Sequence, residues 1–97
     1  MQIATGTYGG DGSTVDRLIT TGLSGRIRRL DLFNRTSASD PNWKNDQMPG
    51  KSCWNFGGTP VAWIAFVGAD FTVDFDPLNS GNPNQAGQTY DWTAWSE

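Results

Sequence analysis

Short alternations of apolar and polar residues run along the whole chain, and clusters of Gly, Pro, Asn, Asp and Ser separate them. Successive side chains of a strand point to opposite faces of a sheet, so this period of two predicts β-strands, and no segment shows a helical period of 3.6 residues. The pattern predicts about seven strands, at residues 1–7, 15–21, 26–33, 52–56, 60–67, 70–75 and 89–95. We therefore expect an all-β fold, a small antiparallel β-sandwich of jelly-roll-like character, with residues 1–97 as one domain.

Three of these segments carry more detailed predictions. In residues 70–75 the alternation places Phe71, Val73 and Phe75 inward and Thr72, Asp74 and Asp76 outward. In residues 89–95 it places Tyr90, Trp92 and Ala94 on one face. Residues 60–67 are almost entirely apolar, which is typical of a strand buried on both faces. The second face of that strand would need a cover, either the long loop or another subunit.

The turn signals suggest how some strands connect. Ser24 and Gly25 predict a turn between residues 17–21 and 26–30, which would pair as a hairpin. The consecutive Arg28 and Arg29 interrupt the alternation, which indicates a bulge or a strand exposed on one face.

Two polar stretches, residues 34–51 and 76–88, lack any periodicity and are expected to be long loops. Long loops in small domains are often functional. Trp43 is the unusual member of the first loop, and it either folds back onto the core or anchors a partner. Lys44 and Lys51 lie in the same polar stretch, where we do not expect them to be desolvated.

Charge is distributed unevenly over the chain, which has seven Lys and Arg, ten Asp and Glu and a net charge of −3. Residues 1–51 hold all seven cations and five acids, whereas residues 52–97 hold five acids and no cation. Either basic strands pair with acidic neighbours inside one molecule, or a basic and an acidic face meet between subunits. The acidic balance argues against nucleic acid as a partner, because phosphate binding needs clustered cations.

The residue inventory offers little for catalysis. The chain has no His, and a Ser or Cys nucleophile usually needs an adjacent base. The lone Cys53 excludes an internal disulfide, and we expect it to be a small buried hydrophobe. A carboxylate pair such as Asp74 and Asp76 could serve a glycosidase, but acids on an amphipathic strand are usually a solvated face. We therefore expect no enzyme, no catalytic residues and no cofactor.

Metal and membrane sites are equally weak in the sequence. Zinc would need Cys and His clusters. The oxygen side chains of Asp74, Asp76 and Asn79, or of Asp11, Ser13 and Asp16, could approach Ca²⁺, but such residues also initiate turns. No secretory leader is visible at the N-terminus, and the apolar run 61–67 is too short to cross a bilayer. We expect a soluble protein made in a cytoplasm, with neither a metal site nor a membrane partner.

The opening of the chain carries a recognisable motif. Residues 6–13 read Gly-Thr-Tyr-Gly-Gly-Asp-Gly-Ser, and residues 16–22 read Asp-Arg-Leu-Ile-Thr-Thr-Gly. This pair of segments resembles a module of bacteriophage virion structural proteins, found in tail-fibre-like modules and small particle proteins. The end of the chain is similar as well, with an aromatic-rich strand at residues 89–95 after an Asn-containing loop.

The resemblance implies a virion protein that is assembled in the host cytoplasm. A capsid decoration (cement) protein, docked on the capsid lattice and commonly oligomeric, fits a chain of 97 residues. Its partners would be the major capsid protein or tail proteins, together with further copies of itself. The alternatives are a tail or fibre component and a small carbohydrate-binding β-sandwich module.

Five Trp exceed what a small core needs, so we expect some to be exposed, and Trp43 and Trp95 are the first candidates. The residues we expect at a protein interface are aromatic or basic: Arg26, Arg28, Arg29, Trp43, Trp54 and Trp95. Charge reversal at Arg28 and Arg29 should weaken assembly and change its salt dependence.

Overall fold

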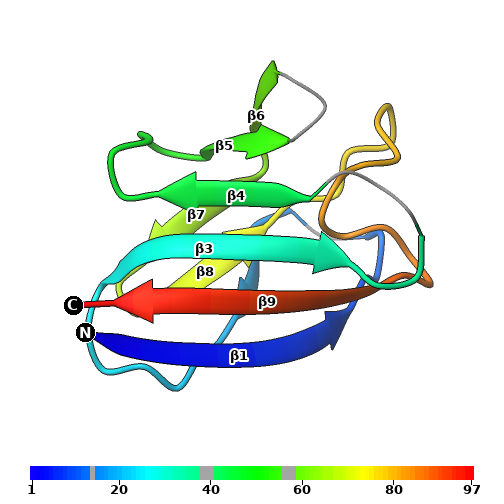
Figure 1. Ribbon diagram of the computed structural model, residues 1–97. Coiled ribbons are helices and arrows are strands. Elements are labelled where there is room, and N and C mark those ends of the chain that lie inside the picture. The colour runs from blue at the N-terminus through cyan, green and yellow to red at the C-terminus, as the bar shows by residue number, and fades with distance from the viewer. Residues whose placement is uncertain (14, 38–40, 56–58) are drawn as a thin grey trace.

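Two antiparallel sheets face each other in the computed structural model, which describes residues 1–13, 15–37, 41–55 and 59–97 (Figure 1). The larger sheet has the strand order β1 (Gln2–Gly9), β9 (Thr89–Ser96), β3 (Ile27–Asn34), β4 (Asn42–Asn45), β5 (Ser52–Asn55), β6 (Thr59–Ala62). The smaller sheet has the order β2 (Arg17–Ile19), β8 (Asp70–Val73), β7 (Ile64–Val67). The predicted antiparallel β-sandwich is confirmed, with nine strands in the described residues instead of about seven.

Aromatic rings fill the space between the sheets. Tyr8 stacks on Tyr90 at 5.1 Å between ring centroids, and Phe71 meets Trp92 edge-on at 5.7 Å. Rings at these separations add stabilisation beyond the area they bury. In β9 every second residue is buried, so the prediction that Tyr90, Trp92 and Ala94 share the inner face is confirmed.

The apolar run at residues 60–67 is not one strand, so the prediction of a strand buried on both faces is wrong. The chain leaves the larger sheet after β6, turns at the buried Trp63 and enters the smaller sheet as β7. The run contributes to the core from both sheets in succession. Trp63 and Ile64 are buried, and Val61 and Phe66 pack against the core, whereas Ala62 and Val67 are exposed. Main-chain bonds fix this corner, since Asp74 N donates to Trp63 O and Ile64 N donates to Lys51 O.

The predicted hairpin between residues 17–21 and 26–30 is also wrong. β2 pairs with β8, whereas β3 pairs with β9 and β4, so the two segments belong to different sheets. The predicted bulge is confirmed, because the register between β3 and β9 shifts between Ile27 and Arg29.

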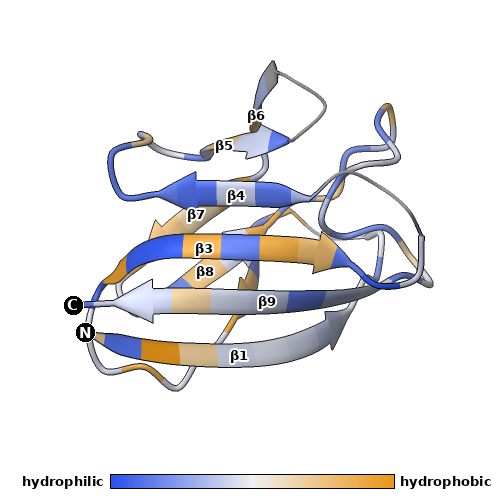
Figure 2. Ribbon diagram, in the orientation of Figure 1, coloured by the Kyte–Doolittle hydropathy of each residue, from blue (hydrophilic) through white to orange (hydrophobic). Residues whose placement is uncertain are grey.

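β4 lies inside the stretch that was expected to be a loop. Its sequence is Asn-Trp-Lys-Asn, which is hydrophilic over almost its whole length in Figure 2. The strand forms because its main chain pairs with β3 on one side and β5 on the other. Main-chain pairing does not depend on side-chain hydropathy, so the hydropathy pattern did not predict this strand.

The end of β8 corrects a further prediction. Phe71 and Val73 are buried as expected, but Thr72 and Asp74 are only 7% and 8% exposed, although both were predicted to face outward. The strand ends at Val73, so Asp74 and Asp76 do not share a strand face. Thr72 lies between Leu18 and Ala65 in the register of the smaller sheet.

The glycine-rich turn after β1 packs against the second polar stretch. Gly10 N donates to Gln88 O, and Gly12 N donates to Asn84 O at 2.9 Å. The Tyr8 hydroxyl donates to Pro83 O at 2.8 Å, and the Tyr90 hydroxyl donates to Asn82 O. The loop at 76–88 contains no strand, as predicted, but it is tied to the other end of the chain.

Candidate functional site

The side of the larger sheet that turns away from the core gathers aromatic and charged side chains. Directly paired residues of antiparallel strands point to the same face. The register places Ile3, Trp95 and Arg29 in one row across β1, β9 and β3. A second row continues across the sheet through Thr5, Thr93, Asp31, Trp43, Trp54 and Pro60. We call this surface, which also includes Phe33, the outer face.

Arg29 is the charged centre of the outer face. Its guanidinium lies 5.0 Å from the centroid of the Trp43 ring and 3.0 Å from Oδ1 of Asp31. Beside them a depression of about 70 Å³ is lined by these three residues together with Phe33, Pro41 and Asn42. The arrangement offers an aromatic ring, a cation and a carboxylate within one small area.

The five tryptophans divide into two groups. Trp63 and Trp92 are buried in the core, as expected. Trp43, Trp54 and Trp95 are each partly buried, so the prediction that Trp43 and Trp95 are exposed is wrong, because neighbouring side chains on the sheet cover part of each ring. Because Trp43 belongs to a strand and points away from the core, it does not fill the interior.

Of the six residues predicted for an interface, the structure brings Arg29, Trp43, Trp54 and Trp95 together on the outer face. Arg26 and Arg28 instead lie at the start of β3. Arg26 pairs with Glu97 at 2.9 Å, and Arg28 pairs with Asp46 at 2.7 Å. Sequence reasoning did not select Asp31 or Phe33, and the alternation within residues 26–33 was the signal that could have placed both beside Arg29.

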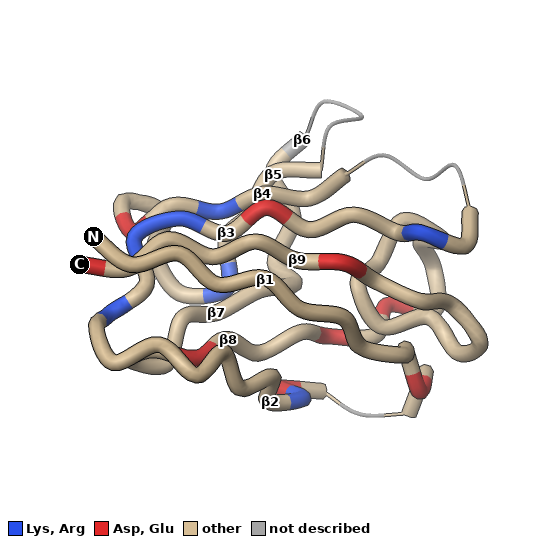
Figure 3. The backbone as a smooth tube through the Cα atoms, turned by 60° about the horizontal axis from the view of Figure 1, so that its bottom comes forward, with Lys and Arg blue, Asp and Glu red and all other residues tan. Residues whose placement is uncertain are grey.

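Charge pairing is intramolecular, which was the first of the two alternatives. Each Arg lies within 4 Å of a carboxylate of the same chain, and basic and acidic positions lie next to one another along β3 (Figure 3). A hydrogen bond from Arg28 lowers the pKa of Asp46, and a hydrogen bond from Arg35 lowers the pKa of Asp91. Within each of these exposed pairs, the two opposite charges neutralise each other.

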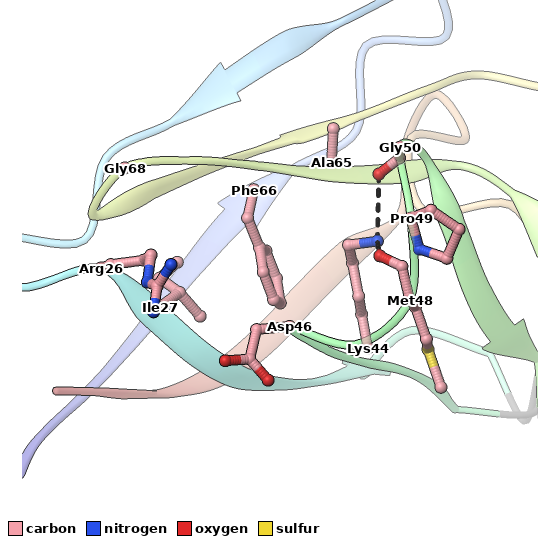
Figure 4. Close-up of a pocket in the computed structure, with 10 residues that line it drawn as sticks. All are labelled: Arg26, Ile27, Lys44, Asp46, Met48, Pro49, Gly50, Ala65, Phe66 and Gly68. Atoms are coloured by element: carbon pink, nitrogen blue, oxygen red, sulfur yellow. Dashed lines mark hydrogen bonds between the residues drawn. The ribbon is translucent and has the colours of Figure 1, made fainter.

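A second hollow, of about 340 Å³, opens between the sheets beside Lys44 (Figure 4). Lys44 is only 1% exposed, contrary to the expectation for a polar loop. Its Nζ donates to the carbonyls of Met48, Gly50 and Ser52, at 2.6 to 3.0 Å. Burial lowers the pKa of Lys44, and the three acceptors satisfy all three donors of the ammonium group. Lys44 therefore holds the 46–50 turn against the sheet through these hydrogen bonds.

The carboxylates considered for catalysis or Ca²⁺ have structural partners. Asp74 accepts from the main chain of Asp16 and from Lys51 Nζ, at 2.9 and 3.0 Å. Asp76 accepts from Trp63 Nε1 and from the main chain of Leu78. Among the described residues, no group of three or more His, Cys, Asp or Glu side chains is placed to hold a metal ion.

Cys53 is fully buried, as expected, and burial raises the pKa of its thiol. In the described part of the chain, no helix has the length and apolar character needed to cross a bilayer.

No protein family matches the sequence, and no curated protein or solved structure matches it either. The geometry of this chain is therefore the guide to its function, and the outer face is its most distinctive surface.

Proposed function

We propose that the protein is a structural component of a bacteriophage particle, a capsid decoration protein that docks through its outer face. The observation that carries the proposal is the gathering of Arg29, Trp43 and Trp54 on one side of the larger sheet. That side faces the viewer in Figure 1, with the smaller sheet behind it.

The chemistry of this face suits protein–protein docking. Trp, Tyr and Arg dominate the residues that contribute most to binding at protein interfaces. A stable contact needs roughly 800 Å² from each partner, and a sheet of six strands has a broad face. Repetition of a modest contact over a symmetric lattice would strengthen attachment through effective concentration. The virion class comes from the resemblance of residues 6–13 and 16–22.

The first test is the location of the protein. Mass spectrometry and immunogold electron microscopy of purified particles, from the phage whose genome encodes this chain, should find it on the capsid. Label confined to the tail would replace decoration by the tail-component alternative. Absence from purified particles would end the virion proposal altogether.

The second test addresses the outer face. Purified protein should bind capsids stripped of it, and Trp54→Ala or Arg29→Glu should weaken binding tenfold or more. Matched controls are Leu18→Ser and Val67→Ser, because both side chains are exposed on the smaller sheet. If the controls weaken binding as much as the outer-face variants, the docking surface has been assigned wrongly.

A glycan is the second candidate ligand of the same face, and the depression beside Trp43 favours it. Sugars stack on aromatic rings and accept or donate hydrogen bonds, and Arg29 and Asp31 supply both functions next to the ring. A glycan array followed by calorimetry on Trp43→Ala tests this alternative. Binding that Trp43→Ala abolishes would support it, and a blank array would count against it.

A further inference from the structure

β1 is an edge strand with unusual properties. It is eight residues long, it contains neither a charged residue nor Pro, and it pairs with β9 in one continuous register. No strand within the described ranges pairs with its other side, and it forms the lower margin of the larger sheet in Figure 1. Among the described residues, no hydrogen bond outside the β1–β9 pairing reaches the main chain of residues 3–8. Every second residue there leaves an N–H and a C=O unpaired.

The remaining edges of the two sheets are protected. β6 has four residues and contains Pro60, which has no main-chain N–H to donate. β2 has three residues and begins with a charged side chain, Arg17. β7 also has four residues, and main-chain bonds engage both its ends, from Ile64 N to Lys51 O and from Ile27 N to Gly68 O. Short strands, Pro, charges and covering segments are the devices that prevent edge pairing, and β1 has none of them over residues 3–8.

We propose that β1 is the dimerisation edge of this protein and that its occupant is β1 of a second copy, paired antiparallel. Two copies of this edge are complementary, because a two-fold axis through the middle of β1 places the unpaired N–H and C=O groups of one copy opposite those of the other. The chain carries a net charge of −3, yet β1 itself contains no charged residue. Two charged side chains, Arg17 at Gly9 O and Arg35 at the Thr7 hydroxyl, lie at the C-terminal end of β1, and each is paired with a carboxylate. The two larger sheets would join into one of twelve strands.

The side chains along this edge suit such a pairing. Ile3, Thr5 and Thr7 lie on the outer face of β1, and β-branched residues pack well across strand pairs. Ile3 is 61% exposed in the single chain. A side chain of the second β1 that packs against Ile3 would remove apolar surface from water. The dimer would also place the two outer faces side by side. The inference does not depend on the proposed virion function, because the mass of the free protein tests it without a capsid.

Sedimentation equilibrium tests the proposal directly. The wild-type chain should sediment at twice its mass of 10.6 kDa. Thr5→Lys should sediment as a monomer, because it places two like charges close to the axis. Leu18→Lys is the matched control, since it adds the same charge at an exposed position of the smaller sheet, and it should remain dimeric. A wild-type chain that stays monomeric at millimolar concentration would overturn the proposal, and so would a folded Thr5→Lys variant that still dimerises.

Hydrogen exchange of the wild-type protein provides a test that needs no variant. The outward amides of residues 3–8 should exchange more slowly as the concentration rises, because pairing protects them. Exchange at these amides that is independent of concentration would overturn the proposal even if Thr5→Lys failed to fold. Trp54→Ala, which alters the docking face, should leave the dimer mass unchanged.

Discussion

Gly10 lies directly against the main chain of Gln85. A methyl group on its Cα would stand 2.1 Å from the Gln85 carbonyl oxygen, which is far inside van der Waals contact. The turn after β1 and the loop before β9 therefore meet backbone to backbone, although 75 positions separate the two residues. The motif that carries the virion resemblance has a structural role at this point.

Gly10→Ala should be strongly destabilising, by about 2–3 kcal/mol, because the main chain of the 76–88 loop must move to admit the methyl group. Gly9→Ala is the matched control. The neighbouring glycine has nothing within 4 Å of an added Cβ, so this change should be neutral or slightly stabilising. Urea denaturation of both variants measures the difference. Equal losses at the two positions would contradict this account of the turn.

Lys44→Met should lower the free energy of unfolding by about 2–3 kcal/mol. The substitution keeps the apolar stem but removes the donor from the carbonyls of Met48, Gly50 and Ser52, and buried acceptors without a partner are costly. Arg26→Met is the control, because the Arg26–Glu97 pair is half-exposed and such pairs contribute little. If chemical denaturation gave both variants the same loss in the free energy of unfolding, the hydrogen bonds of Lys44 would not be important for stability.

Stability should fall on the alkaline side of neutrality. Burial raises the pKa of the Cys53 thiol and of the Tyr8 and Tyr90 hydroxyls. The unfolded chain releases these protons near pH 8.5 for Cys and near pH 10 for Tyr, whereas the folded chain retains them. The unfolded state then binds fewer protons, so stability decreases as the pH rises. The contribution is fully present below about pH 8 and is lost progressively above that value.

Denaturation midpoints measured from pH 6 to pH 11, together with tyrosinate absorbance, check this prediction. Absorbance should rise only as the protein unfolds. A reversible tyrosine titration near pH 10 in the folded state would contradict it. Cys53→Ala should flatten the early part of the decline, whatever its effect on absolute stability.

The two arginines at the start of β3 should differ in their effects on docking. Arg29 lies on the outer face over the Trp43 ring, whereas Arg28 is paired with Asp46 at the bulge. In the capsid-binding assay, Arg29→Glu should reduce the affinity for capsids more than Arg28→Glu does. It should also reduce the salt dependence of that affinity more. If both reversals act equally, the interface extends beyond the outer face to the start of β3.

The alternation of side chains was enough to predict the fold class and much of the core. A period of two assigned Phe71, Val73 and the inner residues of β9 correctly. The alternation of apolar and polar residues within each strand is local, and it indicates which face of the strand is buried. The burial of Cys53 and the bulge at Arg28 also followed from local composition.

The pairing of strands depended on tertiary structure. Nothing within residues 17–21 indicates that they pair with β8, since the partner lies about 50 positions away. The same reason explains why the apolar run at 60–67 did not reveal its break at Trp63. Because the exposed Ala62 and Val67 are also apolar, the composition of this run does not distinguish one strand with two apolar faces from two strands with one inner face each.

The candidate site was partly predictable. Composition alone indicated more tryptophan than a small core needs and a concentration of arginine in the first half of the chain, and these two features selected Arg29, Trp43, Trp54 and Trp95. Only the register of β9, β3, β4 and β5 decided that these four share one face and that Asp31 lies among them. The burial of Lys44 likewise required the tertiary structure, because three carbonyls from the turn and β5 create the environment that removes its charge from water.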